Sequence, residues 1–137
     1  MPARYICVSA RERPFPMTAS PASPLDAETL RRLRELDPSG GNKLLERVVA
    51  AFSNSLERLL PELDRARHAT PPDLVAVRQV SHTLKSSSAS LGALALSARC
   101  AEIEALARDG RSDGLSEQLD AMLADIHLVR AALAALL

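Results

Sequence analysis

Apolar side chains recur every three or four residues along most of this 137-residue chain, a spacing that places them on one face of an α-helix. The pattern predicts a short leading helix after Asp26 and four long helices, over residues 42–66, 72–90, 93–108 and 115–136. No segment shows the strict alternation of a strand. Because short loops force neighbouring helices to run antiparallel, we expect an all-α fold: an antiparallel up-and-down four-helix bundle with a short leading N-terminal helix.

Polar and proline residues mark the ends of these helices. Asp26 is a suitable N-cap for the leading helix. That helix carries three leucines, Leu30, Leu33 and Leu36. Pro61 lies inside the second helix and is expected to kink or break it, since proline lacks the amide hydrogen that the helix needs. At the next boundary, Thr70 is the expected cap and Pro71 the first helical residue.

The first 24 residues lack this periodicity. Five of the nine prolines lie there, and no apolar stripe is present to pack against a core. We therefore expect residues 1–24 to form a flexible, proline-rich N-terminal tail. Residues 25–137 then form one helical domain, of a length typical of a single folded unit.

Composition favours helices and argues against several classes of protein. Hydrophobic residues make up 47% of the chain but aromatic residues only 2%, so leucine and alanine, both strong helix formers, must fill the core. The formal net charge is zero, which gives no electrostatic reason to expect binding to nucleic acid or to an anionic membrane. No apolar run approaches the ~20 residues needed to cross a bilayer, and none is typical of a signal peptide, so we expect a cytoplasmic protein.

The spacing of the cysteines and of two of the histidines does not indicate a metal site. Cys7 and Cys100 are far apart, and Cys100 falls on the apolar face of a predicted helix, where it acts as a small core residue. His68 lies at a helix end, where a histidine suits the helix dipole, and His127 follows a core position. Neither has carboxylates or thiols beside it at ligand spacing, so we expect no metal.

The third histidine, His82, lies in a different setting. Winding its helix at ~100° per residue gathers five apolar residues on one face: Leu74, Val77, Val80, Leu84 and Leu91. By the same geometry His82 points roughly 130° away from that face, toward solvent. Six neighbours share its side of the helix: Val75, Arg78, Gln79, Lys85, Ser86 and Ala89. A lone surface histidine is most often only a surface residue, so position alone assigns no function.

The residues that follow this histidine resemble the signature of histidine-containing phosphotransfer (HPt) domains. That signature is His-x-Leu-Lys-Gly with a second glycine six residues later, and His82, Leu84, Lys85 and Gly92 match it in type and spacing. One position departs, because Ser86 stands where the family usually has glycine. The resemblance extends over about residues 25–137 through Phe52, Leu96, Cys100, Ile103, Glu104 and the Arg-Asp-Gly at 108–110.

The resemblance implies a phosphorelay carrier in a two-component system. His82 would accept a phosphoryl group from an aspartate of one receiver domain and pass it to another, and Lys85 would contact the phosphate. Glu104 would hydrogen-bond the imidazole and set its tautomer, as in chemotaxis-kinase phosphotransfer domains; a structural role for Glu104 stays equally open. The implied partners are response-regulator receiver domains and a hybrid sensor histidine kinase. The implied Mg²⁺ belongs to the receiver, and we expect this chain to be a monomer without its own cofactor.

The other residues on the histidine's side are expected to meet the partner. The small side chain of Ser86 keeps the imidazole open to an approaching domain, and its hydroxyl is able to donate a hydrogen bond to a phosphate. Val75, Gln79 and Ala89 extend this surface. Arg78 lies there too. We interpret it as a solvated cation on the helix surface and do not expect it to bind the phosphate.

Two other classes of function stay open. The chain has only five glycines and no glycine-rich phosphate loop, so we expect a phosphohistidine carrier that neither binds ATP nor phosphorylates itself. A helical bundle that docks a receiver or kinase and modulates it without carrying phosphate is the first alternative, and His82→Ala would leave that function intact. A bundle whose histidines hold a metal or cofactor is the second.

Overall fold

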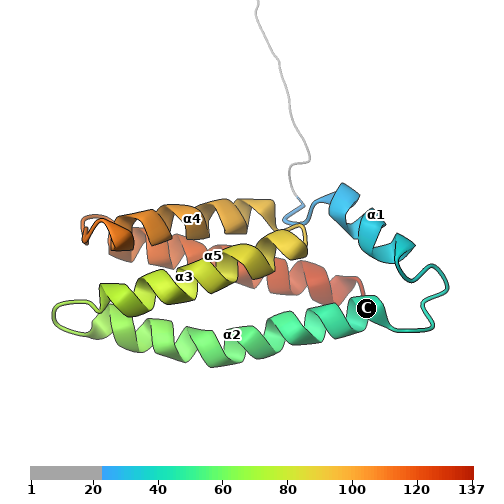
Figure 1. The fold of residues 1–137 in the computed structure, drawn as a ribbon, viewed down its shortest axis with the longest axis horizontal. Coiled ribbons are helices and arrows are strands. Elements are labelled where there is room, and N and C mark those ends of the chain that lie inside the picture. Colours follow the sequence, from blue (N-terminus) through green and yellow to red (C-terminus); the bar gives the residue numbers. More distant parts are fainter. Residues whose placement is uncertain (1–22) are drawn as a thin grey trace, which may run out of the picture.

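The computed structural model describes residues 23–137, and every regular element in that range is a helix. Five helices follow one another: α1 (Ala27–Glu35), α2 (Leu44–His68), α3 (Leu74–Ser90), α4 (Leu94–Arg108) and α5 (Leu115–Ala135). The helices α2 to α5 run alternately in opposite directions, and α1 lies at one end of them (Figure 1). The predicted four-helix bundle with a short leading helix is confirmed. The predicted flexible tail lies outside the described residues, apart from Ser23 and Pro24.

The core runs along the middle of the bundle and is almost entirely aliphatic. Its largest fully buried side chains come from all four long helices: Leu56, Leu63, Val77, Val80, Leu84, Leu91, Leu96, Ile103, Leu119, Met122, Val129 and Leu133. Removing each such side chain from water contributes about 1.5–3 kcal/mol. Cys100 is buried among them, as predicted, and burial raises the pKa of its thiol to about 12. No helix within residues 23–137 has the length and apolar character to span a membrane.

The most extensive helix pairing is between α3 and α4. Ser81 and Ser88 are fully buried on α3, and neither hydroxyl has a hydrogen-bond partner among residues 23–137. The close packing of the two helices therefore uses their small volume. Ser97 of α4 donates a hydrogen bond from Oγ to the main-chain oxygen of Lys85, over 2.8 Å. These contacts hold the exposed side of α3 in a fixed position relative to α4.

Gly92 makes the turn between α3 and α4 and joins it to α1. Its φ is +83°, and the amide of Ala93 donates back to the oxygen of Ser88 over 2.9 Å, which ends α3 as a glycine-containing Schellman motif does. The oxygen of Gly92 accepts the amide of Asp26 over 2.7 Å. A Cβ at this position would lie 2.9 Å from Cβ of Thr29. The glycine that the resemblance highlights is therefore required by the backbone.

The start of α3 differs from the prediction. The helix begins at Leu74, and Asp73 is its N-cap, whose carboxylate accepts the amide of Ala76 over 3.1 Å. The prediction of Thr70 as the cap and Pro71 as the first helical residue is wrong. A carboxylate caps at least as well as a threonine hydroxyl, and its charge also complements the positive end of the helix.

The helices α1 and α2 each differ from the prediction at one point. Pro61 is expected to kink or break its helix, and α2 continues through it without a break. Pro61 and Glu57 are both exposed, so water can reach the Glu57 carbonyl that the missing amide leaves unpaired. Leu36 was expected on the apolar stripe of the leading helix but is 73% exposed, because α1 ends at Glu35 and Leu36 is its C-cap.

Candidate functional site

His82 lies in the middle of α3, on the side that faces away from the core. Its side chain is 64% exposed, whereas Ser81 before it and Leu84 after it are fully buried. The helix is capped by Asp73 at its start and closed by Gly92 at its end. The imidazole is therefore presented to solvent from a rigid platform, as its helical phase predicts.

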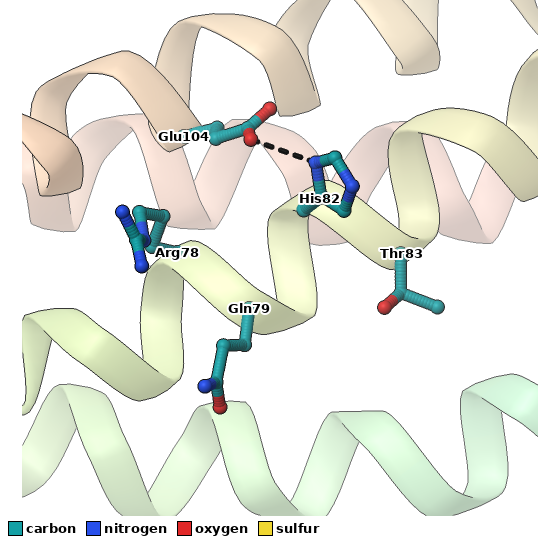
Figure 2. Close-up of a pocket in the computed structure, with 5 residues that line it drawn as sticks. All are labelled: Arg78, Gln79, His82, Thr83 and Glu104. Atoms are coloured by element: carbon teal, nitrogen blue, oxygen red, sulfur yellow. Dashed lines mark hydrogen bonds and ion pairs between the residues drawn. The ribbon is translucent and has the colours of Figure 1, made fainter.

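A carboxylate from the neighbouring helix holds the imidazole. Oε2 of Glu104, on α4, lies 2.8 Å from Nδ1 of His82, a contact shown as the dashed line in Figure 2. The other carboxylate oxygen, Oε1, accepts a hydrogen bond from Nζ of Lys85 over 2.7 Å. The Glu104 side chain is only 15% exposed. The three residues singled out at the sequence level thus form one connected group.

The charge of Glu104 decides which ring nitrogen is free. The hydrogen bond from Lys85, and after it the one from His82, hold the pKa of the Glu104 carboxyl below its ordinary value, although its partial burial opposes this. Glu104 is therefore a carboxylate at neutral pH and can only accept hydrogen bonds. Nδ1 of His82 must then be the donor. In the neutral ring this assignment leaves the lone pair on Nε2.

The free nitrogen is accessible. Figure 2 shows Nε2 on the edge of the ring away from Glu104, directed along α3 toward its C-terminal end. A nucleophilic nitrogen with a lone pair, an open approach and a fixed orientation is what attack on a phosphorus atom requires.

An open depression lies beside His82 and Glu104. It has a volume of about 390 Å³ and is lined by Arg78, Gln79, His82, Thr83 and Glu104. Small-molecule sites usually enclose most of their ligand, whereas this depression is open to solvent on the exposed side of α3. Its form suits the surface of another protein.

Comparison with known proteins agrees with this geometry. Residues 47–136 match the family described as the Hpt domain. The chain belongs to the Hpt domain family. The match covers α3 and α4 completely, together with α5 and nearly all of α2, so the whole His82 group lies inside the Hpt domain.

Two relatives of this Hpt domain add detail. A protein of Oryza sativa subsp. japonica, named pseudo histidine-containing phosphotransfer protein 2, is 27% identical over 95 residues. That match covers 69% of this chain and 63% of the relative, so less than two thirds of the rice protein is matched. The crystal structure of histidine-containing phosphotransfer protein B (HptB) from Pseudomonas aeruginosa PAO1 is similar in fold, with a TM-score of 0.65 and 26% identity. Here 83% of this chain and 94% of that chain are covered.

Apart from Lys85, the other residues predicted on the His82 side of α3 in this Hpt domain are exposed, as their positions along the helix predict. Val75 is 62% exposed, an uncommon setting for a large apolar side chain. Arg78, Gln79, Ser86 and Ala89 are also exposed. Lys85 is partly buried, and its ammonium is bound to Glu104. The predicted contact of Lys85 with a phosphate therefore stays a prediction.

Two residues that contribute to the site were missed by sequence reasoning. Thr83 lines the depression beside His82, and the only signal for it was its adjacency to the histidine. Ser97 supports the platform through its bond to the Lys85 carbonyl. The sequence indicates only that Ser97 is a serine at a half-buried position of α4. That position alone does not identify the group to which its hydroxyl binds.

The remaining histidines are isolated from this group. His68 is the last residue of α2, is exposed, and its Nδ1 lies 2.8 Å from the main-chain oxygen of Asp64. His127 is exposed on α5. Within the described range, 23–137, no group of three or more histidine, cysteine, aspartate or glutamate side chains is arranged to hold a metal ion.

Proposed function

We propose that this Hpt domain is a phosphorelay carrier, in which His82 accepts a phosphoryl group from an aspartate of one receiver domain and passes it to an aspartate of another. The observation that carries the proposal is the state of the imidazole. Its Nδ1 is held by the Glu104 carboxylate over 2.8 Å, and its Nε2 is free on an exposed helix face. Membership of the Hpt domain family supports the same conclusion.

The proposed reaction needs no proton transfer. The lone pair of Nε2 attacks phosphorus, the bond between phosphorus and the aspartyl oxygen breaks, and the aspartate leaves as a carboxylate. The proton on Nδ1 stays in place, and the phosphorylated ring carries a positive charge that Glu104 faces and offsets. Donation to the second receiver is the reverse of these steps. Catalysis then depends on positioning and on neutralising charge, as is usual for phosphoryl transfer.

Lys85 acts in two ways in this proposal. Before transfer, its 2.7 Å hydrogen bond holds the Glu104 carboxylate in place and lowers the pKa of that carboxyl. An ammonium group has three donors, so Lys85 can keep its bond to Glu104 and turn another hydrogen toward the phosphoryl group. Its fixed charge would also offset part of the phosphoryl charge.

The surface around His82 is the proposed docking site for receiver domains. Val75 supplies exposed apolar area, Arg78 and Gln79 supply polar contacts, and Ser86 and Ala89 are small enough to let a partner approach. The metal ion, Mg²⁺, would come with the receiver, and the phosphoryl group would come ultimately from a hybrid sensor histidine kinase. We propose that the chain works as a monomer in the cytoplasm.

The experiment that tests the proposal uses a receiver domain carrying a labelled aspartyl phosphate. Incubation with this protein should move the label onto it, and the bond formed should be labile to acid but stable to base. His82→Gln should stay helical and take no label. His127→Gln, which changes another exposed histidine of the bundle, is the matched control and should be labelled normally. Undiminished labelling of His82→Gln would overturn the proposal.

The same experiment separates a second candidate function. The rice relative is named a pseudo histidine-containing phosphotransfer protein, so docking of a receiver or kinase without carrying phosphate is the alternative. In that case both the parent protein and His82→Gln would bind the receiver, and neither would take the label.

A further inference from the structure

We propose that the hydroxyl of Ser86 binds the phosphoryl group carried on His82 and donates a hydrogen bond to one of its oxygens. This inference rests on the proposed phosphorelay function and names an additional group of the same site. It concerns the one position of the signature at which this chain departs from the family's usual residue, since a glycine there has no donor to offer.

The first argument is placement. Ser86 follows His82 by four residues on α3, which puts the two Cβ atoms about 5–6 Å apart on one helix face. The Cα–Cβ bond of a helical residue tilts toward the N-terminus, so the Ser86 side chain leans toward His82. Figure 2 shows Nε2 of His82 directed toward the C-terminal end of α3. A phosphoryl group on Nε2 would therefore project toward Ser86.

The second argument is availability. Ser87 donates its hydroxyl hydrogen to the oxygen of Thr83 over 3.1 Å, and Ser90 donates to the oxygen of Ser86 over 3.0 Å. Ser88 is buried. Ser86 is exposed, and within the part of the chain that the structure describes its hydroxyl has no hydrogen-bond partner. In this serine-rich turn it is the exposed hydroxyl that remains able to bind a ligand.

The third argument is the distribution of charge around the ring. A phosphoryl group brings negative charge and three acceptor oxygens. Lys85 can turn one of its remaining hydrogens toward these oxygens while it keeps its 2.7 Å bond to Glu104, so further acceptor oxygens stay without a donor. Arg78 lies one turn before His82, on the Glu104 side of the ring in Figure 2, while Nε2 is directed the other way. On the side where the phosphoryl group would lie, the Ser86 hydroxyl is a further donor that α3 provides.

The test is the equilibrium constant for phosphoryl exchange between this protein and a receiver domain, measured from both directions. A hydrogen bond that exists only in the phosphorylated protein shifts this constant, whereas an effect on docking changes both rates alike and leaves it unchanged. We expect Ser86→Ala to lower the phosphohistidine fraction, with the constant falling about fivefold. Ser86→Thr keeps a hydroxyl and should retain the parent value. Ser90→Ala, an exposed serine one turn further, is the matched control and should also retain it.

The outcomes distinguish this inference from the function on which it rests. Alanine favours helices, so Ser86→Ala should fold, and its helix content can be checked by circular dichroism. If the Ala and Thr variants and the parent share one equilibrium constant while His82 is phosphorylated in all of them, the Ser86 contact is overturned and the phosphorelay function stands. If no protein in the series takes a phosphoryl group at His82, both are overturned.

Discussion

Oε2 of Glu104 lies 2.8 Å from Nδ1 of His82, although 22 positions separate the two residues in the chain. The contact exists because α3 and α4 pack closely along their length, with Ser81 and Ser88 leaving room between them. One carboxylate therefore orients the imidazole and, through its second oxygen, holds Lys85. The packing of the two helices and the chemistry of the exposed site are parts of one arrangement.

Replacing Glu104 should release the imidazole. In Glu104→Ala the Nδ1 hydrogen loses its acceptor, so the ring should lose its preference for the tautomer with the proton on Nδ1. Nitrogen NMR of His82 reports that preference directly. The rate of phosphoryl transfer should fall about tenfold, the equivalent of one hydrogen bond to a charged group. Glu102→Ala removes an exposed carboxylate from the same helix and should change neither quantity. An unchanged tautomer in Glu104→Ala would assign Glu104 a structural role.

Lys85 should lower the pKa of the Glu104 carboxyl. The Lys85 hydrogen bond is the largest cause of the lowered Glu104 pKa, so Lys85→Ala should raise that pKa toward the ordinary value of 4.5. A carboxyl whose pKa is lowered by folding stabilises the folded protein at pH values above its unfolded-state pKa. This contribution is lost as the pH falls through the folded-state pKa. The difference in unfolding free energy between parent and Lys85→Ala should therefore shrink as the pH is lowered below about 4.5. Carbon NMR of the Glu104 carboxyl follows the titration itself. A Glu104 titration that is identical in both proteins would show that Lys85 does not act through Glu104.

Gly92 should be less replaceable than Gly110. Both have positive φ, +83° and +70°, but a Cβ at Gly92 meets Thr29 at 2.9 Å whereas one at Gly110 meets nothing within 4 Å. Gly110→Ala should cost only the backbone strain, about 1 kcal/mol of unfolding free energy. Gly92→Ala should cost about 2–3 kcal/mol, because α1 or the α3–α4 turn must also shift. Denaturant unfolding of the two variants measures the difference, and equal losses would show that the contact between this turn and α1 contributes nothing.

Much of the fold was predictable from the spacing of apolar residues. Every long helix was predicted within about two residues of its observed bounds, because each carries an apolar stripe that only one helical phase can bury. The helix ends were less predictable. Asp73 and Thr70 are both capping residue types, and the choice between them depends on how the loop enters the bundle. The continuation of α2 through Pro61 likewise depends on the exposed setting of Glu57, where water can bind the carbonyl that proline leaves without an amide partner.

The sequence predicted that His82, Lys85 and Glu104 form the site, but it did not predict the hydrogen bond between Lys85 and Glu104. Helical phase placed His82 on the exposed side of α3 and Lys85 one turn on, and the resemblance supplied Glu104. The direction of the Lys85 ammonium was not predictable, since a flexible side chain on one helix can reach either a phosphate beside it or a carboxylate on the next helix. The packing of α3 on α4 decides this, and it brings the ammonium within 2.7 Å of Oε1 of Glu104.

The most direct test of the account is to determine which nitrogen carries the phosphoryl group. The protein, uniformly labelled with nitrogen-15 and phosphorylated by a receiver domain, can be examined for scalar coupling between phosphorus and the ring nitrogens of His82. Because Nδ1 is held by Glu104 over 2.8 Å, the account predicts coupling to Nε2 alone. Coupling to Nδ1, or a phosphoryl group on any residue other than His82, would contradict it.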